Sequence, residues 1–276
     1  MMRMKKKLSA ILTNVIAWAI SAVCMIPLLL ILFNSLKNSN AASDMNLKLP
    51  GSIEWSNFLN VIEKGKLGAS SFANSILYSV CSVAVCVLLA AMAAYVLSRN
   101  GSKFYRVIYM YLVLGITMPI NYVALTKVMM FLHINNTRLG IILLYAAMQL
   151  PFSVFLIHGF VARIPRELDE AAVIDGCGST RLFISIILPL LKPALATVIV
   201  LTFLNTWNEF VSPLYFLSSS DKWPMTLSIY NFFGMYFKEW NLVCADILLT
   251  SLPVILVYLA GQKYIVSGMI AGAVKG

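Results

Sequence analysis

Charged residues are scarce in this chain of 276 residues. Asp, Glu, Lys and Arg make up 12% of it, whereas hydrophobic residues make up 60%. A typical soluble domain carries roughly 25% charged residues. The chain therefore has too few polar side chains to cover a water-soluble particle. This excludes an ordinary soluble globular domain and indicates a lipid bilayer as the surroundings.

Short motifs of enzymes and metal sites are also missing. The 5 Cys and 2 His residues form no CxxC pair or Cys/His cluster, so we predict no metal site and no disulfide framework. The phosphate-binding loop Gly-x-x-x-x-Gly-Lys-[Ser/Thr] is absent, as are His-Glu-x-x-His and Gly-x-Ser-x-Gly. We therefore expect a chain that is not an enzyme, binds no cofactor itself and does not hydrolyse ATP.

Long apolar stretches dominate what is present. A helix needs about 20 mostly apolar residues to cross the hydrocarbon core of a bilayer. The first stretch is too long for a signal peptide, so we take it as a retained helix. The sequence predicts an all-α, polytopic membrane protein forming a single domain over 1–276. Its six transmembrane helices are expected at about 8–34, 72–98, 104–128, 139–161, 192–217 and 244–266.

Basic residues are distributed unevenly among the connections. With a cytoplasmic N-terminus, 13 of the 21 Lys and Arg residues fall inside and 8 fall outside. Cytoplasmic connections carry such an excess, so both termini and the segment 162–191 are predicted to be cytoplasmic. The basic residues do not form one face. We therefore attribute the net charge of +10 to topology and to contact with anionic membrane lipid, not to nucleic-acid binding.

A polar island, 167–176, separates two of the apolar stretches. Glu167, Asp169 and Glu170 suit the positive end of a helix dipole. Leu168, Ala171 and Ala172 then share one narrow face of the helix. Pattern alone leaves two interpretations open: a docking element for a partner in the aqueous phase, or an ordinary amphipathic connector between spans.

The ends of this predicted helix carry further signals. Pro165 is expected in its first turn. Gly176 permits a left-handed stop after Asp175. Ser179 or Thr180 can cap a second helix that runs to Pro189. The sequence thus predicts a helix–turn–helix elbow lying on the membrane.

These residues resemble the EAA loop of bacterial ATP-binding-cassette importer permeases. The match covers Glu170-Ala171-Ala172, Asp175-Gly176, Phe183, Leu188-Pro189 and Pro193, and it departs at Cys177, where Ala is commoner. The Trp207–Phe210 run and the segment 262–276 are similar to the carbohydrate-uptake subfamily, in particular to the shorter six-span permease of maltose-type importers. The resemblance extends over nearly the whole chain.

The resemblance implies a permease subunit for sugar or oligosaccharide import in the bacterial inner membrane. Its partners would be a second homologous permease, two cytoplasmic ATPase subunits that bind ATP and Mg²⁺, and an extracellular sugar-binding protein. The tail 271–276 would reach the ATPase pair. The elbow would couple to the ATPase through Glu167, Leu168, Glu170, Ala171, Ala172, Asp175, Gly176, Phe183 and Pro189.

Two other functions remain open. The solute of such a permease could be a glycerol-phosphate compound or a peptide. An ion-coupled secondary transporter is a further alternative, although no internal inverted repeat is evident. It would leave the cytoplasmic elbow unexplained.

Candidates for the substrate path lie within the predicted spans. Pro119 is expected to kink the third span beside Asn121 and Tyr122. In the fifth span, the aromatic face of Trp207 and the amide of Asn208 suit a sugar ring. Glu209 is an ionisable residue within a span, which marks a functional candidate by default. A packing role for Glu209 is the favoured alternative.

Overall fold

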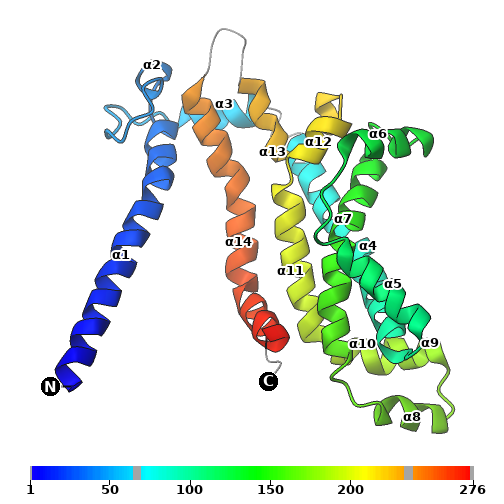
Figure 1. Ribbon diagram of the computed structural model, residues 1–276. Helices are drawn as coiled ribbons and strands as arrows, with labels where there is room; N and C mark the ends of the chain where they lie inside the picture. Colours follow the sequence, from blue (N-terminus) through cyan, green and yellow to red (C-terminus); the bar gives the residue numbers. More distant parts are fainter. Residues whose placement is uncertain (1, 65–69, 233–238, 274–276) are drawn as a thin grey trace. The chain divides into compact units, whose positions relative to one another are not determined.

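The computed structural model describes residues 2–64, 70–232 and 239–273, with side chains described over 11–64, 70–232 and 239–265. All regular structure in these ranges is helical (Figure 1). The elements are α1 (Met2–Ser35), α2 (Ser39–Ala42), α3 (Ser56–Lys64), α4 (Phe72–Arg99), α5 (Lys103–Leu114), α6 (Tyr122–Phe131), α7 (Arg138–Val161), α8 (Glu167–Ile174), α9 (Ser179–Leu182), η2 (Phe183–Ile187), α10 (Leu188–Leu190), α11 (Lys192–Asn208), α12 (Val211–Phe216), η3 (Ser220–Lys222), α13 (Met225–Ser228), η4 (Ile229–Phe232) and α14 (Trp240–Ala273).

The chain divides into two compact units. The first comprises Met1–Ala69 and Ser228–Ser251, and the second comprises Ser70–Leu227 and Leu252–Gly276. Helix α14 begins in the first unit and continues into the second. Both units are therefore assembled from segments that lie far apart in the sequence.

The first unit is held together by buried amide side chains. Asn57 donates from Nδ2 to the carbonyl oxygens of Ser35 and Lys37, each at 2.8 Å. Asn241 in turn donates to Asn57 Oδ1 at 2.8 Å. These bonds join the end of α1 to α3 and to the start of α14. They satisfy backbone groups at a helix end that would otherwise stay unpaired.

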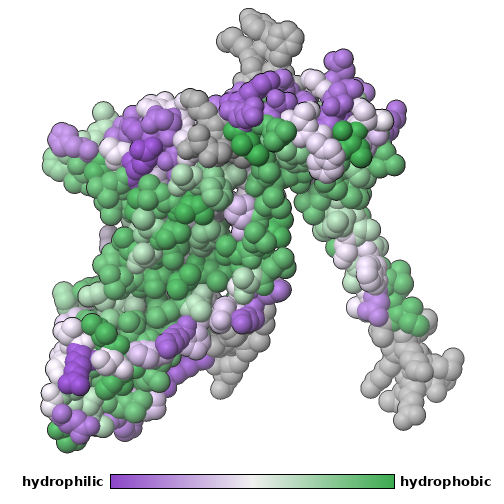
Figure 2. Space-filling model, turned by 180° about the vertical axis from the view of Figure 1, so that it is seen from behind, coloured by the Kyte–Doolittle hydropathy of each residue, from purple (hydrophilic) through white to green (hydrophobic). Residues whose placement is uncertain are grey.

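The core of the second unit lies between α4, α7 and α11. Small residues of α4 are almost wholly buried there, notably Ala90, Ala91 and Ala94. Small side chains let helix backbones approach closely, which is the usual basis of helix packing in membranes. Opposite them lie Val154 and Ile157 of α7. In this unit, apolar surface forms a band with hydrophilic residues gathered at both ends (Figure 2).

The helical fold class is confirmed for the described residues, but six spans are not. Four helices are long and apolar enough to cross a membrane. The segment 179–208 adds a fifth if its two parts, bent by 76°, are counted as one span. The four are Ile11–Ser35, Phe72–Arg99, Arg138–Val161 and Trp240–Ile265.

The third predicted span, 104–128, is not one helix. It consists of α5 and α6, separated by the non-helical segment 115–121. The last turn of α5 tightens, since the amides of Gly115 and Ile116 donate to carbonyls three residues back. Asn121 then starts a new helix by accepting from Ala124 N at 3.0 Å. The expected kink at Pro119 is therefore a complete break of the helix.

The fifth predicted span, 192–217, is also interrupted. Helix α11 ends at Asn208, and Glu209 has an extended backbone. In a continuous helix the ring of Pro213 would clash with the carbonyl of Glu209, four residues earlier. The chain avoids the clash by ending α11 and starting α12 at Val211.

Candidate functional site

The polar island forms the expected elbow. Helix α8 carries Glu167, Asp169 and Glu170 in its first turn. It stops at Gly176, whose φ of 78° lies in the left-handed region. Gly176 N donates to Val173 O and Cys177 N donates to Ala172 O, a pair of bonds that closes the helix end. The predicted glycine turn is therefore present.

Two details of the predicted elbow are wrong. Pro165 lies before the helix, because α8 begins at Glu167 with Arg166 as its N-cap residue. The second limb is capped by Gly178, and no side chain bonds to its free amides, so neither Ser179 nor Thr180 acts as the cap. This limb continues through a π-helical turn, η2, and past Pro189 to Leu190.

One side of α8 packs against the body of the second unit. Ala172 is buried in the same cluster as Ala94 and Val161. Asp169 lies beside it, with Oδ2 at 2.5 Å from Nε of Arg99, the last residue of α4. On the second limb, the Phe183 ring lies 5.4 Å from that of Tyr95, also on α4. Helix α4 thus contacts both limbs of the elbow.

The opposite side of α8 faces solvent. Glu167, Glu170, Ala171 and Asp175 are exposed. So are three larger apolar residues, Leu168, Val173 and Ile174, of which Ile174 is 85% exposed. We refer to Leu168, Glu170, Ala171, Val173 and Ile174 as the outer face of α8. The predicted set thus splits: Ala172 and Phe183 pack inward, while Leu168, Glu170 and Ala171 face outward.

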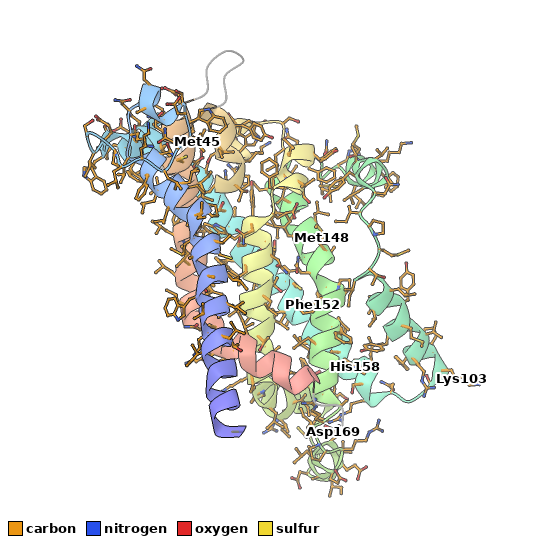
Figure 3. The ribbon with its side chains drawn as sticks, turned by 60° about the vertical axis from the view of Figure 1, so that its left-hand side comes forward. Met45, Lys103, Met148, Phe152, His158 and Asp169 are labelled. Carbon is orange, nitrogen blue, oxygen red and sulfur yellow. The ribbon has the colours of Figure 1, made fainter. Side chains whose placement is uncertain are left out.

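A second candidate site is an open cavity of about 410 Å³ in the second unit. It is bordered by the break between α5 and α6, by α7 and by α11. Its polar side chains are Gln149 and Asn205, whose amides are hydrogen bonded at 3.0 Å. Met148 and Phe152 lie one turn apart along α7, with His158 nearer the end at which Asp169 lies (Figure 3). The remaining lining residues are Gly115, Ile116, Met118, Ile120, Ala147, Met148, Pro151, Phe152 and Leu201.

None of the residues predicted for the substrate path lines this cavity. Trp207 is only 1% exposed, and its ring lies 5.5 Å from that of Phe203. Asn121 caps α6, and Tyr122 stacks on Tyr215 with ring centroids 4.7 Å apart. Asn208 is exposed and donates to Leu204 O at 2.9 Å.

Glu209 makes contacts that favour a packing role. Its carboxylate accepts from Ser212 N at 2.8 Å, which caps α12. Its carbonyl oxygen accepts from the Thr226 hydroxyl at 3.1 Å and from the Tyr145 hydroxyl at 3.5 Å. Sequence reasoning missed Arg99, Gln149 and Asn205 as site residues. The cavity could have been predicted from two amide side chains, Gln149 and Asn205, that interrupt apolar stretches of the sequence.

The arrangement defines a multi-pass helical membrane protein with a cavity that carries two amide side chains and with a protruding elbow. The family model described as "Binding-protein-dependent transport system inner membrane component" matches residues 86–271. The chain belongs to this family. It is therefore a transport component of the membrane and not an enzyme, and the ABC-permease resemblance read from its motifs is confirmed.

Relatives and a solved structure agree with this family. The chain is 32% identical over 280 residues to the melibiose/raffinose/stachyose import permease protein MelC of Bacillus subtilis, with 100% of both chains covered. It is 32% identical over 262 residues to the diacetylchitobiose uptake system permease protein NgcG of Streptomyces coelicolor, covering 92% of this chain and 85% of that one. A crystallised bacterial ABC transporter for import of the polysaccharide alginate contains a chain of the same fold, with a TM-score of 0.80 at 24% identity. The match covers 92% of this chain and 95% of that one.

Proposed function

We propose that this chain is a permease subunit of an ATP-driven importer of oligosaccharides, and that it forms one half of the translocation path. The observation that carries the proposal is the cavity with the Gln149–Asn205 amide pair. Amides donate to and accept from hydroxyl groups, and apolar side chains cover the faces of a sugar ring. The relatives named for oligosaccharide uptake support the same class of solute.

The elbow is proposed as the energy-coupling element. Its outer face combines exposed Leu168, Val173 and Ile174 with the charge of Glu170. An exposed apolar patch on a soluble part of a protein marks a surface that a partner covers. We assign it to a cleft in a cytoplasmic ATPase subunit, one of two in the complex. A second permease and an extracellular sugar-binding protein complete the proposed assembly.

The proposed orientation places both termini and α8 in the cytoplasm. Arg163, Arg166, Arg181 and Lys192 surround the elbow, and cytoplasmic connections favour such residues. The predicted contact of the tail 271–276 with the ATPase pair includes residues 274–276, which lie outside the described residues. That contact stays a prediction.

Uptake by whole cells tests the function. Cells that carry the complete transporter are compared with cells that lack only this chain, using labelled melibiose, raffinose and diacetylchitobiose. We expect saturable uptake of at least one of them, lost without this chain, resistant to an uncoupler and abolished by ATP depletion. Loss of uptake on uncoupling at constant ATP would indicate a secondary transporter. Competition by peptides or glycerol phosphates alone would contradict the sugar assignment.

A further inference from the structure

The guanidinium of Arg99 joins three elements of the second unit. Arg99 is the last residue of α4. Its Nη1 donates to the carbonyl oxygens of Val161 at 3.4 Å and Ile164 at 3.1 Å, at the C-terminal end of α7. That end carries the negative pole of the helix dipole, which attracts a cation. Its Nε forms the ion pair with Asp169 of α8.

We propose that Arg99 and Asp169 are a positioning pair, through which a displacement of the elbow reaches α7 and the cavity. The proposal rests on the proposed coupling of α8 to an ATPase. It goes beyond that coupling because it names the contact inside this chain that passes the movement onward. Neither residue belongs to the outer face of α8 or to the cavity lining.

Adjacent acids on α8 face opposite ways. Glu170 is exposed, whereas the side chain of Asp169 is only 17% exposed and that of Arg99 only 12%. Two charges withdrawn from water depend on each other, since loss of either one leaves the other uncompensated. Asp169 therefore fixes α8 to its own chain, and Glu170 remains available to a partner.

Helix α7 provides a short route from Arg99 to the cavity. The helix between Val161 and the cavity residue Phe152 is about 13 Å long, from a rise of about 1.5 Å per residue. Pro151 follows immediately and also lines the cavity. Because proline has no N–H, the hydrogen-bond ladder is interrupted there and the helix can bend. The segment held by Arg99 thus ends where the backbone of α7 lacks one hydrogen-bond donor.

A second contact, between the rings of Tyr95 and Phe183, also joins the elbow to α4. That contact attaches the second limb, not the first, to α4, with the ring centroids 5.4 Å apart and the rings tilted by 41°. The ion pair instead fixes one point of α8 to one point of α4 and α7. The first limb thus meets α4 and α7 through the packing of Ala172 and through this ion pair, and the ion pair is its charged link to both helices.

The test uses the complete purified transporter in proteoliposomes, with its sugar-binding protein and labelled sugar. Asp169→Asn keeps the side-chain size, whereas Arg99→Gln is shorter but stays polar, and each removes one charge. We expect each to lower the amount of sugar imported per ATP hydrolysed by about tenfold or more. Basal ATPase activity per assembled complex should stay within about twofold of wild type, because neither residue lies on the outer face of α8 that we assign to the ATPase.

The double variant and two further variants decide the outcome. If the residues act as a unit, Arg99→Gln combined with Asp169→Asn is no worse than the poorer single variant. Arg99→Lys should be intermediate, because it keeps the charge but cannot place one nitrogen at the two carbonyls and another at Asp169. The exposed Arg106→Gln on α5 serves as the matched control and should behave as wild type.

Other results would contradict the proposed role of Arg99 and Asp169. The proposed role would be contradicted if both single variants imported as much sugar per ATP as wild type. It would also be contradicted if the loss in the double variant equalled the sum of the two single losses. A parallel fall of uptake, ATPase activity and complex yield would mark a merely structural contact. If the wild-type complex hydrolyses ATP but imports no sugar, the proposed function fails first, and the role of the pair fails with it.

Discussion

Asn205 Nδ2 donates to Gln149 Oε1 across 3.0 Å, which joins α11 to α7 at the wall of the cavity. A primary amide offers two donor hydrogens and an acceptor oxygen with two lone pairs. The bond between the two side chains uses one donor and one acceptor, so each amide has further capacity for a hydroxyl group. The pair is thus held in place and remains able to bind a polar ligand.

Replacing either amide with Leu should weaken sugar binding during transport. A net hydrogen bond is worth about 1 kcal/mol, or roughly a fivefold change in an equilibrium constant. We therefore expect Gln149→Leu and Asn205→Leu to raise the KM for sugar uptake, measured in proteoliposomes, with little change in basal ATPase activity. Asn208→Leu is the control, because Asn208 lies outside the cavity lining and its amide donates to Leu204 O in its own helix. A raised KM in Asn208→Leu alone would favour the path predicted from the sequence.

Local features of the elbow could be predicted from the sequence. Acids at a helix start, a glycine at its end and a proline near the next span act over a few residues, and the structure contains the helix and the left-handed Gly176. Arg99 could not be assigned in the same way. It lies 70 residues before Asp169, and a basic residue at the end of a span looks like an ordinary topological charge.

The course of the spans was harder to predict. Apolar composition over 104–128 is sufficient for a membrane helix, but composition does not reveal that the backbone breaks over 115–121. Trp207 illustrates the same limit for the site. An aromatic residue suits both a sugar platform and a helix contact, and only the fold shows that its ring packs near Phe72 and Phe203.

Changes in the elbow should abolish uptake while the protein still inserts. Gly176→Pro forces φ from 78° to about −65°, which destroys the turn between the limbs. Glu170→Lys reverses the exposed charge that we assign to the ATPase contact. Membrane yield is measured by immunoblot, and ATPase association by co-purification. Normal uptake by both variants would contradict docking through α8.

A side chain at Gly261 should disturb the packing of α14 on α11 in the second unit. A Cβ there would lie 2.7 Å from both methyl carbons of Val200, so the helices would have to move apart. Overpacking of this kind costs roughly 1–3 kcal/mol. Gly261→Ala should therefore lower the thermal unfolding temperature of the detergent-solubilised protein.

Gly159→Ala is the matched control for this change. Gly159 also lies within a membrane helix, but a Cβ there would meet nothing within 4 Å. Alanine favours a helix over glycine by about 1 kcal/mol. The control should be unchanged or slightly stabilised, and equal destabilisation of both variants would show that Val200 is not the cause.

Removing the charge of Lys37 should loosen the first unit. Lys37 is 3% exposed, and its ammonium group donates to three neutral oxygens: Asn34 Oδ1 at 3.0 Å, Asn46 O at 2.9 Å and Asn46 Oδ1 at 3.0 Å. Lys37→Met keeps the apolar stem and removes the ammonium donor. Asn46 O still accepts from Asn34 Nδ2 and Asn46 Oδ1 still accepts from Lys48 N, so Asn34 Oδ1 is the acceptor most affected. Each buried group left unpaired costs about 1–3 kcal/mol.

Limited proteolysis measures the effect of Lys37→Met, because the segment 38–55 follows Lys37 and contains Asn46. We expect faster cleavage within that segment and a lower unfolding temperature. Lys48→Met is the control, since Lys48 lies in the same segment and is exposed. If the two variants are cleaved at the same rate as wild type, the buried ammonium does not organise this part of the chain. The hydrogen bonds of Asn57 and that of Asn34 to Asn46 then hold it.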